Sequence, residues 1–181
     1  MSTDTPQDDA RKQNLTVGFI GLGAMGFPMA GHLQTAGYAT TVFNRSPDKA
    51  SRWQETYGGK TALTPAASAR DADVVFVCVG NDDDVREVTL GNQGVLETLK
   101  PGSLLIDHTT ASADLAQELQ SACMEKDIGF LDAPVSGGQA GAELGQLTIM
   151  VGGDSTSFDS AKAVMAVYGK SVRLMGPCGS G

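Results

Sequence analysis

The segment Leu15–Gly26, LTVGFIGLGAMG, decides the fold of this chain. Its apolar run Leu15–Ile20 is typical of a buried strand, and the glycines that follow match the pattern G-x-G-x-x-G at the start of a helix reaching about Gly37. A strand, a glycine-rich turn and a helix, in this order, form the phosphate-binding unit of dinucleotide-binding proteins. The segment therefore predicts a nucleotide site at the carboxyl end of the first strand.

Beyond this segment, short apolar runs alternate with helical stretches, as in a parallel sheet covered by helices. The run Val74–Val79 is continuously apolar, which predicts a central strand buried on both faces. Ser46 and Pro47 predict the start of a helix that ends near Tyr57. We expect a single α/β domain of the Rossmann type, with a doubly wound and mostly parallel sheet. The other expected strands are Thr40–Phe43, Leu104–Asp107, Ile128–Ala133, Leu147–Val151 and Val172–Met175, and the other expected helices are Ser112–Lys126 and Phe158–Tyr168.

Composition limits the class of protein and the place of the domain. Residues 1–14 are polar and lack the apolar core of a signal peptide, so we expect a disordered leader before a domain over residues 15–181. A formal net charge of −8 argues against a nucleic-acid binder, and no apolar run is long enough to span a membrane. The 3 cysteines have no metal-ligand spacing and fit a reducing cytoplasm, which predicts neither a disulfide framework nor a metal site.

Each glycine of the fingerprint has its own physical role. Gly21 permits the tight turn, Gly23 lets a pyrophosphate approach the backbone, and Gly26 lets the helix pack closely on the strand. The phosphates would then face N–H groups at the positive end of the helix. The alternative is a plain turn between a strand and a helix. We predict a cofactor site that includes all six residues of the fingerprint, namely Gly21, Leu22, Gly23, Ala24, Met25 and Gly26.

The end of the second strand predicts which dinucleotide is bound. NAD enzymes usually carry an acid there, about twenty residues after the glycines, whereas this chain has Asn44, Arg45 and Ser46. A carboxylate would repel a 2′-phosphate, while a guanidinium and a hydroxyl would bind it. These residues favour NADP as the cofactor. The alternative is NAD, with Ser46 acting only as a helix cap and Arg45 as a solvated surface charge.

Three motifs together resemble the β-hydroxyacid dehydrogenases, the family of 3-hydroxyisobutyrate dehydrogenase. The motifs are Val17–Leu33, Asp107–Thr110 and Asp132–Gly138, and the resemblance covers residues 15–181. In that family a Rossmann-type domain precedes an all-helical domain, and the active site lies between them. The resemblance implies hydride transfer between NADP or NAD and a small 3-hydroxy acid or its semialdehyde. It also implies a homo-oligomer when the helical domain is present.

The same resemblance implies a substrate site in the motif Pro134–Gly138. The family's serine hydroxyl and glycine amides bind the substrate carboxylate, which assigns Ser136, Gly137 and Gly138 to the catalytic site. Bare glycine amides after a strand end also form an anion nest, although Ser-Gly-Gly is equally an ordinary turn.

Further cofactor contacts are implied by matching positions along the chain. Thr110 matches a threonine near the nicotinamide end, and Val79 and Gly80 match the segment that passes under the dinucleotide. Asp84 aligns with an asparagine that contacts the cofactor in some members of the family, and an acid at this position departs from the family pattern. Asp82 and Asp83 precede it, and three consecutive acids are more typical of a helix start than of a metal site.

The histidines and lysines bear on catalysis. His108 is a second departure from the family pattern. It is either a proton shuttle near neutral pH or a side chain that only shapes the pocket, and His32 is interpreted as structural. The family's catalytic lysine would fall four residues past Gly181, and Lys162 and Lys170 match no catalytic position. The 181 residues are therefore expected to bind cofactor with little catalysis.

Other functions remain as alternatives. A non-catalytic dinucleotide-binding or interaction module would not need the motif at Ser136. In 6-phosphogluconate dehydrogenase the Ser-Gly-Gly motif is followed by Gly-Pro-Ser, where this chain has Gly145–Leu147. Imine reductases share an Asn-Arg segment and NADPH use but lack Pro-Val-Ser-Gly-Gly.

Overall fold

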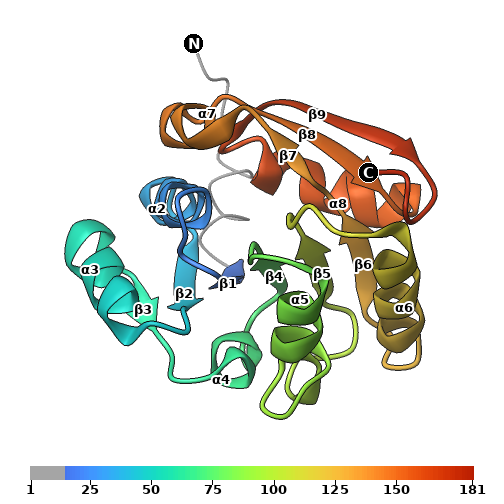
Figure 1. The fold of residues 1–181 in the computed structure, drawn as a ribbon, viewed down its shortest axis with the longest axis horizontal. Coiled ribbons are helices and arrows are strands. Elements are labelled where there is room, and N and C mark those ends of the chain that lie inside the picture. Colours follow the sequence, from blue (N-terminus) through green and yellow to red (C-terminus); the bar gives the residue numbers. More distant parts are fainter. Residues whose placement is uncertain (1–14) are drawn as a thin grey trace.

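The computed structural model describes residues 15–181, so the expected leader over residues 1–14 lies outside the described part. Helices cover both faces of a mostly parallel sheet, which confirms the predicted doubly wound α/β architecture (Figure 1). The strands are β1 (Thr16–Ile20), β2 (Ala39–Phe43), β3 (Lys60–Thr61), β4 (Val74–Val77), β5 (Leu104–Asp107), β6 (Gly129–Asp132), β7 (Val135–Ser136), β8 (Leu147–Gly152) and β9 (Gly169–Gly176). The helices are α2 (Gly26–Thr35), α3 (Pro47–Tyr57), α4 (Pro65–Ala69), α5 (Asp82–Thr89), α6 (Ala113–Met124), α7 (Gly138–Leu144), α8 (Ser155–Met165) and the short 3-10 helix η1 (Val95–Glu97).

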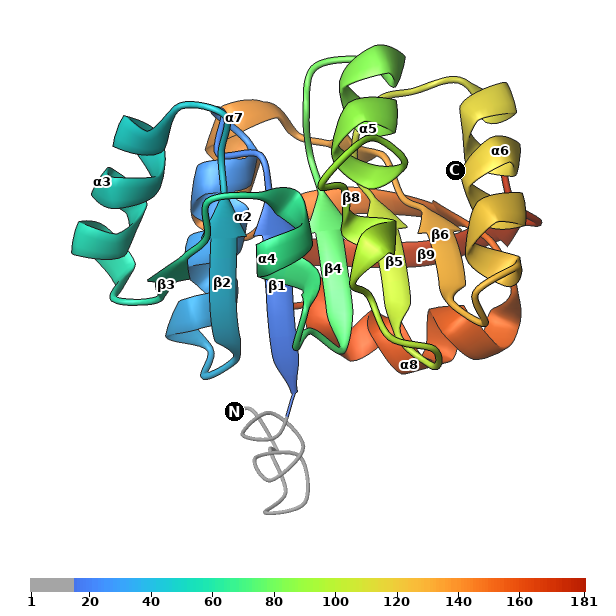
Figure 2. The ribbon, with the colours of Figure 1, turned by 90° about the horizontal axis from the view of Figure 1, so that it is seen from below.

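The parallel part of the sheet has the strand order β3-β2-β1-β4-β5-β6. β1 pairs with β2 on one side and with β4 on the other, so the strands β2 and β3 extend from β1 in one direction and β4 to β6 in the other. In open α/β sheets the crevice at such a switch point, outside the carboxyl ends of the strands, is where ligands bind. Figure 2 shows the parallel strands side by side, with the loop before α5 at one shared edge.

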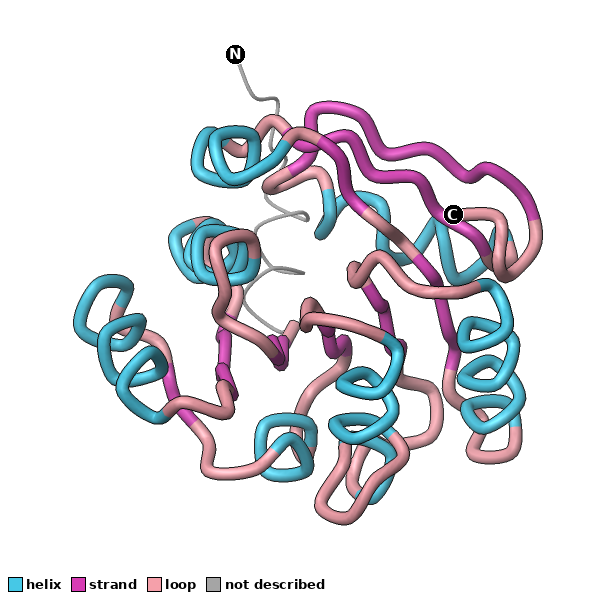
Figure 3. Tube along the Cα trace, in the orientation of Figure 1, coloured by secondary structure: helices cyan, strands magenta, loops and turns pink. Residues whose placement is uncertain are grey.

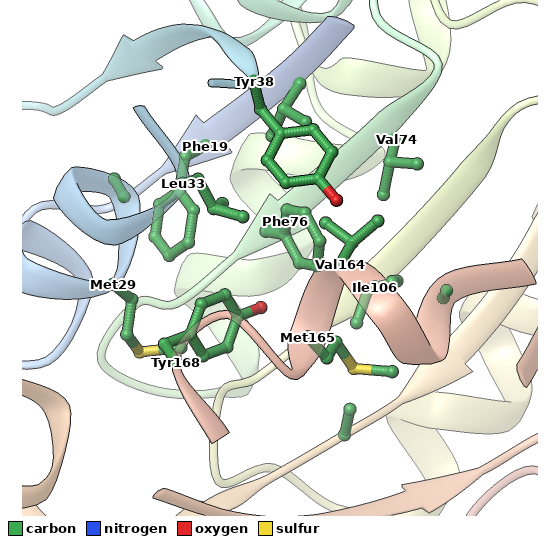
Figure 4. Packing of buried hydrophobic residues seen from close by; sticks show 14 of the residues in the cluster. Phe19, Met29, Leu33, Tyr38, Val74, Phe76, Ile106, Val164, Met165 and Tyr168 are labelled. Carbon is green, nitrogen blue, oxygen red and sulfur yellow. The ribbon is translucent and has the colours of Figure 1, made fainter. Parts of the chain in front are cut away.

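β4 shows how the sequence builds two cores from one sheet. Val74 and Phe76 pack into the cluster under α2, α3 and α8, while Val75 and Val77 pack into the cluster under α4, α5 and α6. All four side chains are buried, as the continuous apolar run predicted for these residues. Figure 4 shows Phe76 in the first cluster, close to the ring of Tyr168.

The carboxyl-terminal strands depart from the parallel pattern. β8 runs antiparallel to β6, at Asp132 and Gly152, and antiparallel to β7, while β9 runs parallel to β8. Figure 3 shows β8 and β9 side by side. β6 and β8 were predicted from the sequence, but β3, α4, β7 and α7 were not. The two missed strands have 2 residues each and the two missed helices have 5 and 7, so all four are too short to show a recognisable periodicity.

The end of the chain also needed correction. The helix expected over Phe158–Tyr168 is α8, which starts earlier because the Asp154 carboxylate accepts a hydrogen bond from Ser157 N. Tyr168 lies in the turn after it, and β9 already begins at Gly169. The longest helix in residues 15–181 is α6, with 12 residues, and none of the helices in this range could cross a membrane.

Candidate functional site

The turn after β1 can be made only by glycines at two of its positions. Gly21 has a φ of +100°, and a Cβ there would overlap the carbonyl oxygen of Cys78. A Cβ on Gly26 would overlap the carbonyl oxygen of Gly21. At Gly23, by contrast, a Cβ would meet nothing within 4 Å, because this residue faces open space. The turn is therefore closely packed at Gly21 and Gly26 and open to solvent at Gly23.

Asn44 ties this turn to the end of β2. Its Oδ1 accepts a hydrogen bond from Leu22 N at 2.9 Å, and its Nδ2 donates to Ser46 O at 3.1 Å. Gly21 N also donates to Phe43 O at 2.9 Å. Both polar atoms of the Asn44 side chain make hydrogen bonds within the protein, and these bonds position the glycine turn. Asn44 also lines the cavity described next, so its predicted contact with the cofactor stays a prediction.

A cavity of about 790 Å³ lies over the turn. It brings together all the predicted cofactor residues except Thr110, from the ends of β1, β2 and β4 and from α5. Thr110 is exposed and does not line this cavity. Several lining residues were not predicted from the sequence, among them Lys49 and Glu87, which lie one helical turn after the predicted Ser46 and Asp84. The full lining consists of Ile20–Gly26, Phe43–Ser46, Lys49, Cys78–Gly80, Asp84, Glu87 and Val88.

The amino-terminal end of α2 opens into this cavity. Within residues 15–181, the backbone N–H groups of Gly23, Ala24 and Met25 have no hydrogen-bond acceptor, and Met25 provides no side-chain cap. Free N–H groups at a helix start carry partial positive charge and suit an anion. The geometry of the turn can therefore accept a phosphate group close to the backbone.

Arg45 and Ser46 lie on the rim of the same cavity. Arg45 Nη2 is 3.1 Å from Asp84 Oδ1 and 3.6 Å from Glu87 Oε2, so the guanidinium is held by two carboxylates from α5. Ser46 occupies the N-cap position of α3, but its side chain makes no capping hydrogen bond. The alternative role of Ser46 as a side-chain helix cap does not match this geometry, whereas Arg45, whose side chain is 76% exposed, also fits the alternative of a solvated surface charge.

The three consecutive acids at the start of α5 bind separate protein groups. Asp82 accepts hydrogen bonds from Ser112, which lower the pKa of its carboxyl, and Asp83 pairs with Arg86 at 3.3 Å. Asp84 pairs with Arg45. Residues 15–181 contain no group of three His, Cys, Asp or Glu side chains placed to hold a metal.

The loop after β5 is tied to the loop after β4. Thr109 Oγ1 accepts a hydrogen bond from Val79 N at 3.0 Å, and Thr109 N donates to Asp107 Oδ1 at the same distance. The pKa of Asp107 is raised to about 7, mainly by burial and to a smaller extent by the charge of the nearby Asp132. Thr109, which the sequence analysis did not single out, thus holds one wall of the cavity.

His108 lies in the hydrophobic core and not in the cavity. Its Nδ1 donates to Ala133 O at 2.6 Å, and its Nε2 lies 2.6 Å from the Tyr168 hydroxyl. The ring stacks on Phe76 with centroids 5.5 Å apart, and burial lowers the pKa of His108 to about 4. The proton-shuttle role is therefore wrong. His32 is also structural, because its Nε2 contacts the carbonyl oxygens of Ala142 and Glu143 at the end of α7.

The predicted substrate motif lies at the start of α7. Ser136 is exposed in β7, and Gly137 and Gly138 turn the chain with φ values of +132° and +64°. These residues do not line the cavity over the glycine turn. However, a neighbouring groove of about 530 Å³ is lined both by Leu22–Ala24 and by Gln139, so α7 lies beside the glycine turn.

Comparison with known proteins agrees with this geometry. The family described as "NAD binding domain of 6-phosphogluconate dehydrogenase" matches residues 16–176. An uncharacterized oxidoreductase of Shewanella frigidimarina is 55% identical over 165 residues, covering 91% of this chain and 57% of the relative. A probable 3-hydroxyisobutyrate dehydrogenase-like protein of Arabidopsis thaliana is 46% identical over 165 residues, covering 91% and 54%. The chain thus spans little more than half the length of these curated relatives.

Solved structures give the same relationship. The 3-hydroxyisobutyrate dehydrogenase of Mycobacterium tuberculosis, solved with L-serine, superposes with a TM-score of 0.86 at 33% identity, covering 92% of this chain and 56% of that one. A protein solved as "Psf3 in complex with NADP+ and 2-OPP" gives 0.85 at 30% identity, covering 91% and 58%.

Proposed function

Because this chain belongs to the 6-phosphogluconate dehydrogenase family of NAD-binding domains, and within it to the 3-hydroxyisobutyrate dehydrogenase group, we propose that it binds NADP(H) over the glycine turn. The domain would span residues 15–181 and would form the cofactor half of an oxidoreductase. That enzyme would exchange hydride between NADP(H) and a small 3-hydroxy acid or its semialdehyde.

The observation that carries the proposal is the meeting of a phosphate cradle and a cationic rim in one cavity. Gly23 leaves open space above the backbone, and the free N–H groups of Ala24 and Met25 suit the pyrophosphate. At the other end of the cavity, no acid follows β2, and Arg45 and Ser46 offer a cation and a hydroxyl to a 2′-phosphate. The relative solved with NADP+ supports the same choice of cofactor.

Residues of this chain would orient both reactants. The turn at Gly21–Gly26 and the loop at Val79–Gly80 would hold the cofactor, whose nicotinamide supplies or accepts a hydride when bound. Ser136, Gly137 and Gly138 would bind the substrate carboxylate through a hydroxyl and two amides. The support for this second site is the placement of α7 beside the glycine turn, together with the family of the relatives.

Titration calorimetry with NADPH and NADH tests the cofactor assignment. We expect the wild-type chain to bind NADPH more tightly, and Arg45→Ala to lose about 1.5–3 kcal/mol of NADPH binding with little change for NADH. Arg86→Ala is the matched control, because Arg86 pairs with Glu118 and Asp83 and does not line the cavity. Equal affinities for NADPH and NADH in the wild type would refute the NADP assignment.

A further inference from the structure

Two carboxylates hold the cation that the proposed NADP site would use. Asp84 and Glu87 lie three residues apart on α5, on one face of the helix, and both approach Arg45 Nη2. The two contacts are unequal. Asp84 is closer, at 3.1 Å, and its side chain is 29% exposed, whereas Glu87 is 3.6 Å away and 70% exposed.

Asp84 is also packed into the wall of the cavity. A Cβ placed on Gly80 would lie 2.7 Å from Asp84 Oδ2, so the carboxylate covers the bare backbone of Gly80. The amide of Asp84 donates to Asn81 Oδ1 at 2.9 Å, which fixes the first turn of α5. Asp84 is therefore a positioned counter-charge that faces Arg45 from across the cavity rim.

We propose that Asp84, assisted by Glu87, is a cofactor-specificity residue that lowers the preference of this chain for NADP over NAD. The proposal rests on the proposed function. A 2′-phosphate bound to Arg45 would compete with the Asp84 and Glu87 carboxylates for the guanidinium, and it would lie near two negative side chains. A 2′-hydroxyl carries no charge and can donate a hydrogen bond to a carboxylate, so NAD does not meet this opposition.

The size of the effect follows from the exposure of the pair. The Arg45 side chain is 76% exposed, and exposed ion pairs contribute up to about 1 kcal/mol, which corresponds to about a fivefold change in affinity. Asp84→Asn should therefore tighten NADPH binding about threefold to fivefold and change NADH binding much less. Glu87→Gln should act in the same direction and more weakly. Added salt should reduce both effects, because it screens exposed charges.

Asp83→Asn is the matched control for Asp84→Asn. Asp83 occupies the same first turn of α5, so its substitution removes the same charge from the helix start. It is 95% exposed, pairs with Arg86 and does not line the cavity. A general effect of net charge or of helix stability would therefore appear in both variants, and a specific effect only in Asp84→Asn.

The test is calorimetric titration of wild type, Asp84→Asn and Asp83→Asn with NADPH, NADH, and the fragments 2′,5′-ADP and 5′-AMP. The fragments isolate the adenosine end of the cofactor. A larger NADPH-to-NADH affinity ratio in Asp84→Asn alone, repeated with the fragments, supports the proposal. An unchanged ratio, weaker NADPH binding, or the same change in Asp83→Asn overturns it. If wild type binds neither cofactor, or prefers NADH, the proposed function fails first.

Discussion

His108 Nε2 lies 2.6 Å from the Tyr168 hydroxyl oxygen, although 60 residues separate the two in the chain. The bond joins the loop after β5 to the turn between α8 and β9, inside the core. Because Ala133 O can only accept, His108 Nδ1 carries the proton and Nε2 accepts from the tyrosine. A second proton on the imidazole would break this arrangement and bury a charge.

This geometry, with the neighbouring Asp107, predicts an unusual pH dependence of stability. The pKa of His108 falls from 6.5 to about 4, so its contribution to stability is lost as pH drops through this range. The pKa of Asp107 rises from 3.8 to about 7, so its contribution is present at low pH and is lost as pH rises toward 7. Between about pH 4 and 6.5 the two contributions to stability change in opposite directions with pH.

Single substitutions should separate the contributions of His108 and Asp107 to the pH dependence of the free energy of unfolding. In His108→Gln the free energy of unfolding should fall with rising pH relative to wild type, and in Asp107→Asn it should rise, by about 1 kcal/mol per pH unit near pH 5. Chemical denaturation followed by the fluorescence of Trp53, the single and fully buried tryptophan, measures this. Parallel pH profiles of the three proteins would contradict the prediction.

Asn44→Ala should weaken the binding of NADPH and of NADH by a similar factor. The substitution removes the acceptor of Leu22 N and loosens the glycine turn, which NADPH and NADH would share. One lost hydrogen bond of this kind amounts to about 1 kcal/mol, or about fivefold in affinity. Calorimetry with both cofactors checks it, with Arg45→Ala as the comparison whose effect should be confined to NADPH. A loss restricted to NADPH would place Asn44 at the 2′-phosphate instead.

Ser136→Ala is expected to impair substrate use without changing cofactor affinity, in a protein that joins this domain to the remaining length of its relatives. Loss of a hydroxyl that contacts a carboxylate should lower kcat/KM about tenfold or more. Steady-state kinetics with semialdehyde acids measures this. Ser160→Ala is the control, because the Ser160 hydroxyl donates a hydrogen bond to Ser157 O on α8, away from the motif. A wild-type kcat/KM in Ser136→Ala would show that Ser136 serves only as a turn residue.

The 181 residues alone should bind NADPH and turn over substrate very slowly. General acid–base catalysis contributes about 10²–10⁴-fold, and His108, buried against Tyr168, has no access to a bound substrate. Oxidation of NADPH with methylmalonate, succinic and tartronate semialdehydes, followed by absorbance, provides the measurement. A turnover of about 1 s⁻¹ or more would contradict this expectation. Lys49, which lines the cavity, would then be the first residue to replace.

Much of the fold was predictable because local sequence determines it. The continuous apolar run Val74–Val77 is typical of a central strand that is buried on both faces, and Gly21 can reach its φ of +100° without strain. The reversal at β8 was not predictable. Asp132 and Gly152 meet there only through long-range pairing, and no local pattern distinguishes a parallel from an antiparallel neighbour.

The parts of the candidate site that backbone geometry defines could be predicted from the sequence. The parts that depend on side-chain contacts with distant residues were less predictable. The glycine positions follow from the fingerprint alone. The engagement of Asn44 with Leu22, and of Arg45 with Asp84, joins residues 22 and 39 positions apart, which a motif does not contain. His108 was misplaced as a candidate for the site for the same reason. Its neighbours Asp107 and Thr109 were no guide to the direction of its ring.

The floor of the cavity is made of backbone, whereas its rim is made of side chains. Gly21 and Gly26 admit no other residue without a clash, so the floor has almost no mutational freedom. Arg45, Asp84 and Glu87 are exposed enough to be exchanged without disturbing either core. If the rim selects the cofactor as proposed, point mutations at the rim would shift the preference between NADP and NAD, while the glycine turn beneath stays the same.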